Sequence, residues 1–447
     1  MIEYRSLRVA LLGAGSVGAQ VARLLLDHGD ELAQRVGAPL ELVGVAVRDV
    51  DAPRTADIPK HLLTTDAESL ILGADIVVEL IGGLEPARSH ILTAISSGAD
   101  VITANKALLA AHGNELFEAA DQVGAQLNYE AAVAGAIPII RPLRDSLAGD
   151  RVHRILGIVN GTTNYILDRM DTEHASLEDA LARATELGYA ESDPTADIEG
   201  YDAAQKAAIL ARLAFHTDVP VALVHREGIT GITKAQVDQA RDSGYVIKLL
   251  AICERLTDAK TGVEGVSARV YPALVHRSHP LAAVHGANNA VFVEAEAAGD
   301  LMFYGAGAGG IETASAVLGD VVSAARRHVV GGPGLVTSAS SGLAVLPIGH
   351  VTTRYQVTLE VLDRPGVLAQ IAGVFADHGV SVETLVQTPP GADPLEEQGG
   401  AERREPTATL VIGTHAAAES DLAATVTALH SHGFVGAVTS VLRVEGA

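Results

Sequence analysis

A short acidic segment followed by a helix holds the residues best suited to chemistry in this chain. Asp202 and Lys206 lie four residues apart where the run Ala207-Ala-Ile-Leu210 predicts a helix, so their side chains share one helical face. A lysine beside a carboxylate can move a proton to or from a substrate oxygen. The same spacing occurs in solvated ion pairs, so the pair alone leaves both interpretations open. Four more carboxylates precede it: Glu191, Asp193, Asp197 and Glu199.

The order of residues from 184 to 206 is more specific than that spacing. The pattern A-x-x-x-G-Y-A-E-S-D-P-T-A-D-I-E-G-Y-D-x-x-x-K closely resembles the signature of homoserine dehydrogenases. Those enzymes interconvert L-aspartate 4-semialdehyde and L-homoserine with a nicotinamide cofactor. The match is long and includes residues of several chemical types, so chance is a poor explanation.

The resemblance implies a role for each matching residue. Glu191 would bind the amino group of homoserine, while Asp197 and Asp202 would hold the polar end of the substrate or orient the lysines. Lys206 corresponds to the residue usually assigned as proton donor, with Lys106 as its partner. The chemistry agrees, because hydride reaching an aldehyde carbon leaves an alkoxide that needs a nearby cation and a proton.

A glycine-rich turn near the start of the chain indicates a dinucleotide site. Gly13-Ala-Gly-Ser-Val-Gly18 lies between the predicted strand Leu7–Leu12 and a predicted helix. The first glycine permits the tight turn, the second lets a pyrophosphate approach the backbone, and the third lets helix and strand pack closely. The helix N-terminus supplies amides and the positive end of a dipole. The expected cofactor-binding residues here are Gly13, Gly15, Ser16, Val17 and Gly18.

The end of the second predicted strand, Leu40–Val47, indicates which cofactor is used. An acid at this strand tip would bind the ribose 2′-hydroxyl, whereas an arginine can pair with a 2′-phosphate. Arg48 comes first, which favours NADP, with Lys60 as a second cation. Asp49 follows directly and keeps NAD as the alternative.

Two later segments also point to the cofactor. The run T-A-N-K-A-L at 103–108 follows a predicted strand and resembles the second lysine motif of the family, which implies that Lys106 is functional. Without that resemblance, Lys106 would be an ordinary lysine at a helix start. Gly305–Gly310 resembles the G-A-G-A-G turn of the family, so Gly309 is expected near the cofactor.

Residues 129–138, Y-E-A-A-V-A-G-A-I-P, resemble the monovalent-cation loop of the family. One carboxylate and several main-chain carbonyls would form a hard-oxygen site suited to a weakly held ion, with sodium expected. Without the resemblance, the segment would be a turn of small residues. The ligands that the resemblance implies are Glu130 and the carbonyls of Val133, Gly135 and Ile137.

The pattern of elements predicts an α/β protein. Residues 1–135 alternate apolar runs with helical patterns, which predicts a Rossmann-type parallel sheet. Residues 136–330 indicate a central α+β domain for substrate binding and oligomerisation, with 305–330 returning to the nucleotide domain. Residues 331–341 are small, polar and flexible, and we expect a linker over 331–350. Residues 351–447 form the last unit.

The last unit resembles an ACT domain, a small ferredoxin-like βαββαβ fold that binds amino acids. The resemblance rests on L-E-V-L-D-R-P-G-V-L-A at 359–369, where Asp363 and Gly366 would shape a turn between strand and helix. Residues 389–406 are rich in Gly, Pro and charge, and predict a disordered loop. If the chain is such a dehydrogenase, the resemblance to an ACT domain implies an amino-acid effector, with L-threonine expected.

Composition excludes several classes of partner. The chain has 447 residues and a net charge of −23, which argues against binding to nucleic acid or anionic membranes. No signal peptide or membrane-spanning stretch is readable, and the single Cys253 excludes an internal disulfide and suits a cytoplasmic location. Cys253 is expected to be buried filler. A homodimer or homotetramer is expected by resemblance.

Two other functions stay open at this point. One is another amino-acid dehydrogenase on the same fold, such as aspartate dehydrogenase, although the acidic motif with Asp202 and Lys206 argues against it. The other is a non-catalytic sensor of nucleotides and amino acids, which would have no need of proton-transfer groups. Aspartate-semialdehyde dehydrogenase requires a thiol nucleophile, and Cys253 is in no suitable setting.

Overall fold

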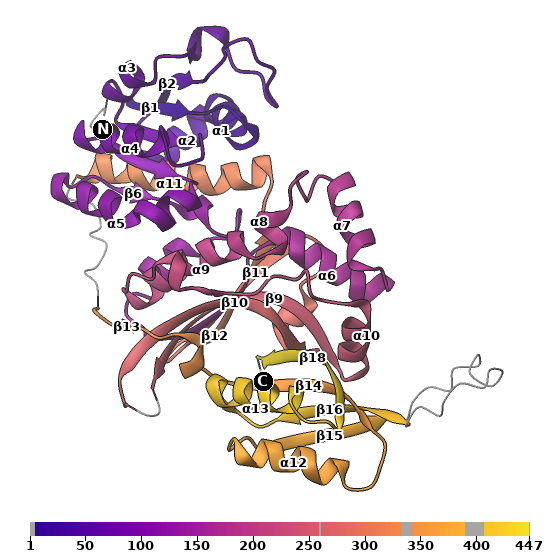
Figure 1. Cartoon of the computed structure of the whole chain (residues 1–447). Helices are drawn as coiled ribbons and strands as arrows, with labels where there is room; N and C mark the ends of the chain where they lie inside the picture. Colours follow the sequence, from indigo (N-terminus) through magenta and orange to yellow (C-terminus); the bar gives the residue numbers. More distant parts are fainter. Residues whose placement is uncertain (1–4, 259–260, 332–340, 389–405, 447) are drawn as a thin grey trace.

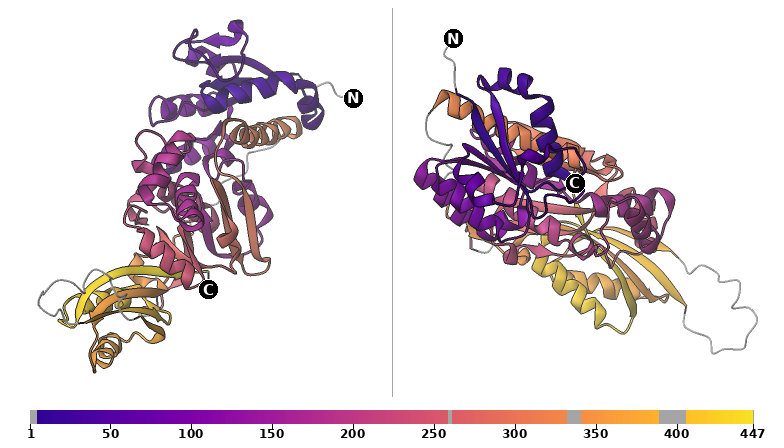
Figure 2. Two further views of the ribbon diagram at one scale, coloured as in Figure 1. Left: turned by 90° about the vertical axis from the view of Figure 1, so that its right-hand side faces the viewer. Right: turned by 90° about the horizontal axis from the view of Figure 1, so that it is seen from above.

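The computed structural model describes residues 5–258, 261–331, 341–388 and 406–446. Three parts follow one another along an elongated molecule: an N-terminal parallel sheet, a central sheet covered by helices, and a small C-terminal α/β unit (Figure 1; Figure 2). The predicted α/β fold class is therefore confirmed. Within the described ranges, no helix is both long and apolar enough to cross a membrane.

The N-terminal sheet is parallel throughout, with strand order β3-β2-β1-β4-β5-β6. The order reverses between β1 and β4, and open sheets of this kind bind ligands at the carboxyl ends of the strands beside such a reversal. The strands are β1 (Leu7–Leu12), β2 (Leu40–Ala46), β3 (Leu63–Thr64), β4 (Ile76–Glu79), β5 (Asp100–Thr103) and β6 (Leu127–Asn128).

Both faces of β1 are buried, which explains its nearly continuous apolar sequence. Val9 and Leu11 share a core with α1 and α11, whereas Ala10 and Leu12 share one with α4 and α5. Helix α11 follows the central part in sequence but lies with the N-terminal sheet (Figure 1). The helices of this part are α1 (Ser16–Asp27), α2 (Gly29–Val36), α3 (Ala67–Leu72), α4 (Ala87–Ser96), α5 (Lys106–Val123) and α11 (Gly310–Val330).

The central part is an antiparallel sheet with order β12-β11-β7-β9-β10, and the short β8 pairs with β10 in parallel. Helices α6 and α9 pack on its face toward the N-terminal part (Figure 1). Cys253 lies in this core, where its thiol donates to the Ala207 carbonyl at 3.2 Å, so its expected burial is confirmed. The strands are β7 (Val152–Ile158), β8 (His225–Arg226), β9 (Tyr245–Thr257), β10 (Glu264–His276), β11 (Asn288–Ala295) and β12 (Gly299–Ala306). The helices are α6 (Gly161–Glu173), α7 (Leu177–Glu186), α8 (Thr195–Ile198), α9 (Tyr201–Phe215) and α10 (Lys234–Asp242).

The C-terminal unit has the βαββαβ order predicted from the sequence. Its sheet order, β18-β14-β16-β15, is that of a ferredoxin-like fold, and both helices cover one face (Figure 1). The elements are β14 (Thr352–Leu362), α12 (Val367–Asp377), β15 (Val382–Thr388), β16 (Thr407–Thr414), β17 (Ala417–Ala418), α13 (Glu419–His430) and β18 (Val435–Glu445).

The linker expected over 331–350 is described only in part. Residues 332–340 lie outside the described residues, and within the remainder β13 (Ala344–Val345) pairs with β10. Strand β18 also pairs with β10 in parallel, so the central and C-terminal sheets are continuous. The C-terminal unit is thus docked by main-chain hydrogen bonds. The disordered loop expected over 389–406 lies outside the described residues except for Pro406.

Candidate active site

Two lysines meet on one buried carboxylate between the N-terminal and central parts. The Nζ of Lys206 lies 2.7 Å from Oδ2 of Asp202, and the Nζ of Lys106 lies 2.9 Å from Oδ1. The Lys206 ammonium also donates to the Val159 carbonyl at 2.7 Å. Side-chain exposure is 8% for Asp202, 11% for Lys206 and 42% for Lys106, so one ammonium is sheltered and the other is accessible.

Helix starts bring these three groups together. Asp202 lies in the first turn of α9 and Lys206 one turn later, so the expected shared face exists. Lys106 is the first residue of α5, and Asn105 caps that helix by accepting from the Leu108 amide at 3.1 Å. The two lysines therefore come from different parts of the molecule.

At this centre the lysines favour the ionised form of Asp202, and Asp202 favours the ionised form of Lys106. Burial alone would raise the pKa of Asp202, but the ammonium groups of Lys206 and Lys106 hold it well below its ordinary value. Burial likewise lowers the pKa of Lys106, yet attraction to Asp202 first, and then to Asp197 and Glu191, raises it overall. The centre therefore presents an accessible cation beside a carboxylate whose ionised form is favoured.

Asn160 connects two of the acids and was not singled out from the sequence. Its Nδ2 donates to Oδ1 of Asp197 at 2.7 Å and to Oδ2 of Asp202 at 3.0 Å. Its Oδ1 accepts from the Thr163 amide at 2.9 Å, which caps α6. An asparagine before Gly-Thr-Thr at the end of a strand is a capping pattern, and that was the available clue.

The other acids of the segment lie at different depths. Burial raises the pKa of Asp197, against the opposing hydrogen bond from Asn160. Glu191 is exposed and acts on Lys106 only through its charge. Asp193 accepts from the Thr195 amide at 3.1 Å, directly before α8, whose N-cap residue is Pro194.

The glycine-rich turn has the geometry that its sequence predicts. Gly13 has φ of +99°, and a Cβ there would lie 2.6 Å from the Leu80 carbonyl oxygen. A Cβ on Gly18 would lie 2.1 Å from the Gly13 oxygen, so strand and helix are in close contact. Gly15 has nothing within 4 Å of that position, which leaves the backbone open to a ligand. Ser16 begins α1 directly afterwards.

Helix α11 begins beside the same turn. Gly309 precedes it with φ of +136°, and a Cβ on Gly310 would lie 2.9 Å from the Ser16 carbonyl oxygen. The N-termini of α1 and α11 therefore meet at one point. Their free amides and dipoles favour an anionic group there.

A buried glutamate shapes the neighbouring strand ends and was missed by the sequence analysis. Oε1 of Glu79 accepts from the Ile81 amide at 2.7 Å and the Gly82 amide at 3.1 Å. Its Oε2 accepts from the Thr103 hydroxyl at 2.6 Å. Asn105 also donates to the Gly83 carbonyl at 2.6 Å, so the segments that follow β4 and β5 are held together directly before Lys106.

Arg48 is exposed two residues after β2. A hollow of about 420 Å³ beyond the strand end has both Arg54 and Lys60 in its lining. Arg54 donates to main-chain carbonyls of the same loop, including Ala52 at 2.7 Å, while Lys60 pairs with Asp51 at 3.3 Å. Both of these cations thus already have partners within the loop.

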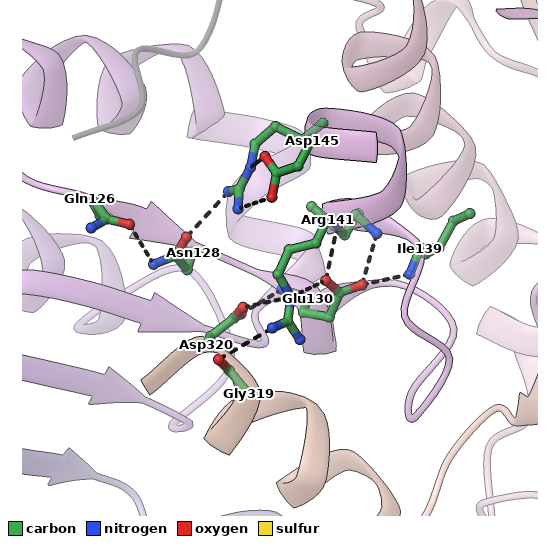
Figure 3. Close-up of polar contacts among 10 residues, drawn as sticks. Gln126, Asn128, Glu130, Ile139, Arg141, Asp145, Gly319 and Asp320 are labelled. Carbon is green, nitrogen blue, oxygen red and sulfur yellow. Dashed lines mark hydrogen bonds and ion pairs between the residues drawn. The ribbon is translucent and has the colours of Figure 1, made fainter. Parts of the chain in front are cut away.

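The carboxylate of Glu130 is fully engaged in hydrogen bonds (Figure 3). It accepts from the amides of Ile139 and Ile140 at 2.6 and 2.8 Å, and from the amide and Nε of Arg141 at 3.0 and 2.9 Å. Its own amide donates to Asp320 at 2.8 Å. A carboxylate with four donors is a poor cation ligand, so the ligand role expected for this side chain does not match its hydrogen bonding.

The main-chain oxygens of the same loop fit a cation better. In the described part of the chain, no hydrogen bond ends on the carbonyl oxygens of Val133, Gly135 or Ile137, although all three residues are buried. Buried carbonyls without a donor are uncommon in folded proteins. Gly135, with φ of +59°, leaves no room for a Cβ against the Gly307 carbonyl, so this loop touches the Gly305–Gly310 turn.

Comparison with known proteins extends these observations. Models described as the homoserine dehydrogenase NAD-binding domain, homoserine dehydrogenase and ACT domain match residues 13–130, 138–322 and 355–434. The homoserine dehydrogenase of Corynebacterium glutamicum is 52% identical, covering 98% of this chain and 95% of that protein.

Two solved structures are similar as well. The homoserine dehydrogenase of Thiobacillus denitrificans has a TM-score of 0.88 and 37% identity, with 99% of each chain covered. A hyperthermophilic archaeal homoserine dehydrogenase in complex with NADPH has a TM-score of 0.60 and 25% identity, covering 73% of this chain and 99% of that one.

A nicotinamide-binding sheet joined to a centre of paired lysines defines an NAD(P)-dependent oxidoreductase. The similarity over nearly the whole length is more specific, and the chain belongs to the homoserine dehydrogenase family, which interconverts L-aspartate 4-semialdehyde and L-homoserine. Aspartate dehydrogenase and a non-catalytic sensor are therefore not favoured.

Proposed function

We propose that Lys206 and Lys106 carry out proton transfer in the homoserine dehydrogenase reaction, with Asp202 holding both in place. The observation that supports this most directly is the contact of two ammonium groups with one buried carboxylate. A nicotinamide cofactor supplies the hydride when bound. The lysines then stabilise the alkoxide that forms at the former aldehyde carbon and donate a proton to its oxygen.

The substrate would be oriented by the acidic segment. Glu191, exposed near Lys106, is proposed to bind the α-ammonium group of the substrate, and Asp197 to complete its polar surroundings. The activity is tested by following NADPH absorbance, which should fall only when the enzyme and aspartate semialdehyde are both present. If neither NADPH nor NADH supports turnover, the proposed activity is contradicted.

For the cofactor we propose NADP over NAD, held by the turn at Gly13, Gly15, Ser16, Val17 and Gly18, by Gly309 and by Arg48. The exposed Arg48 has the charge that a 2′-phosphate requires. The archaeal relative in complex with NADPH is an example of a similar protein that accepts this cofactor.

Arg48→Asp is expected to weaken NADPH binding and shift preference toward NADH, because an anion replaces the phosphate partner. Fluorescence titration with each cofactor measures both effects. Arg35→Asp is the matched control, since Arg35 lies on α2 and pairs with Glu31. Unchanged NADPH affinity in the Arg48 variant would mean that this exposed side chain does not contact the cofactor.

A monovalent cation, sodium by expectation, is proposed to bind the loop of residues 130–137. The ligands would be the main-chain oxygens of Glu130, Val133, Gly135 and Ile137, since the Glu130 carboxylate is occupied. The ion would neutralise buried carbonyl dipoles and hold the loop against the Gly305–Gly310 turn.

Dialysis against a buffer whose only cation is a bulky organic ammonium is therefore expected to lower activity, with recovery on adding sodium or potassium. The physical reason is that carbonyls without donors would repel one another once the ion is removed. The melting temperature should fall when the cation is removed and recover when it is added back. A flat response of both activity and melting temperature to cation concentration would remove the cation from the mechanism.

Regulation by an amino acid is proposed for the C-terminal unit, with L-threonine as effector. The support is the ACT fold and its docking on the catalytic part. Millimolar threonine should inhibit the full-length protein, because a ligand that binds two domain arrangements unequally shifts their populations. Calorimetry and activity on one sample measure binding and inhibition. Full activity in saturating threonine would contradict the proposal.

For assembly we propose a homodimer or homotetramer. Light scattering after size-exclusion chromatography measures this directly, and a monomer at micromolar concentration would contradict it.

A further inference from the structure

A short segment, residues 225–229, lies between the C-terminal unit and the acidic turn before Asp202. Its first two residues form β8, which pairs in parallel with β10 through Arg269 and Val270. The Glu227 amide then donates to the Val270 carbonyl at 2.8 Å. The segment is thus fixed to the strand that also carries β18 of the C-terminal unit.

On one side the segment holds the turn that leads into Asp202. The guanidinium of Arg226 donates to the main-chain oxygen of Glu199 and lies over the Tyr201 ring, 3.6 Å from its centroid. The Ile229 amide donates to the Ile198 carbonyl at 2.7 Å. Three contacts from one segment therefore fix residues 198–201, directly before Asp202.

The backbones are in direct contact at this point. A Cβ on Gly228 would lie 2.3 Å from the Ile198 oxygen and 2.6 Å from the Glu199 Cα. Gly200 has φ of +78° and precedes α9. Because no side chain separates the two segments, a displacement of one must move the other.

On its other side the segment contacts the C-terminal unit. Nη1 of Arg443, on β18, lies 3.0 Å from Oε2 of Glu227. Arg443 is 11% exposed, pairs with Glu419 of α13 at 2.6 Å, and lies over the Tyr271 ring. His225 contacts Oε1 of Glu227 at 2.8 Å. Glu227 therefore joins the segment to the C-terminal unit, and it lies next in sequence to Arg226, which contacts the acidic turn.

We propose that residues 225–229 form the link through which the C-terminal unit sets the position of Asp202. Arg226 is the positioning residue for the acidic turn, and the Glu227–Arg443 ion pair is its connection to the regulatory sheet. The link rests on the proposed regulation by an amino acid. An effector that changes how β18 sits on β10 would move Arg443, and thereby Glu227 and the turn beyond it.

The test compares single and double variants of the full-length enzyme. Glu227→Gln and Arg443→Gln should each raise the threonine concentration for half inhibition about tenfold, within the usual range of allosteric coupling, and the double variant should do no more. Calorimetry should still detect threonine binding. The matched control is Gln239→Ala, which removes a 2.7 Å contact between α10 and Thr358 of the same domain pair and should leave inhibition unchanged.

Arg226 is tested without threonine. Arg226→Met should lower kcat about tenfold and leave the KM for the cofactor unchanged, because it disturbs only the Asp202 turn. Arg226→Lys should recover part of the loss by restoring a donor to Glu199. Thermal unfolding identifies any variant that has lost its fold.

The outcomes separate the link from regulation itself. Wild-type inhibition in both Glu227→Gln and Arg443→Gln would overturn the link, as would an unchanged kcat in Arg226→Met. If the wild type ignores threonine, the proposed regulation fails. The link is then judged by kcat alone: equal, non-additive losses in Glu227→Gln and Arg443→Gln support it, and additive or absent losses overturn it.

Discussion

Lys206→Ala should lower kcat by about 10²–10⁴-fold, the usual contribution of a general acid or base, while cofactor affinity stays unchanged. The ammonium of Lys206 is sheltered between Asp202 and the Val159 carbonyl, so no mobile side chain can replace it. The glycine turn at Gly13 belongs to the N-terminal sheet and has no contact with this side chain among the described interactions. Stopped-flow turnover and NADPH titration on the same preparation separate the two quantities.

A matched control exists on α10. Lys234 and Asp238 are also four residues apart and paired at 3.1 Å, but their side chains are 48% and 36% exposed. Lys234→Ala should leave kcat unchanged. If Lys206→Ala retains more than about a tenth of wild-type kcat, the proton-transfer role belongs elsewhere, with Lys106 as the next candidate.

The nucleotide-binding sheet was predictable because its physical requirements are local. Strand β1 has the bounds that the sequence predicts, and Gly13 and Gly18 occupy positions where a side chain cannot fit. Helix α6 was missed because its sequence, Gly161–Glu173, lacks a clear apolar stripe even though several of its polar residues are buried. Propensity fails where the tertiary environment satisfies polar groups.

The candidate site was predictable residue by residue but not as an arrangement. The helical spacing brought Asp202 and Lys206 together, yet nothing in the sequence says that Lys106 lies against the other oxygen of the same carboxylate. Asn160 and Glu79 act through hydrogen bonds to segments far away in sequence. The docking of the C-terminal unit was missed for the same reason, since pairing of β18 with β10 is a non-local contact.

Asp202→Asn should lower kcat about as strongly as the Lys206 change, by roughly 10²–10⁴-fold, and should also destabilise the fold. The amide would be isosteric but uncharged, leaving the nearly buried Lys206 ammonium without a counter-ion. Removing one partner of a buried pair costs about 3 kcal/mol in the free energy of unfolding. Asp193→Asn is the matched control, because Asp193 is exposed and an asparagine can still accept from the Thr195 amide.

The pH dependence of that variant decides the electrostatic role. The folded-state pKa of Asp202 is depressed, so its stabilisation is present above the unfolded pKa of about 3.9 and is lost as the pH falls further. The stability gap between wild type and Asp202→Asn should therefore be wide at neutral pH and close in acid.

The pKa of Lys106 is raised only because attraction to Asp202 and its neighbours outweighs burial. Without that attraction, burial should lower it and move the alkaline limb of the kcat profile to lower pH. An alkaline limb at the same pH in both proteins would mean that Lys106 is not the cation the reaction needs.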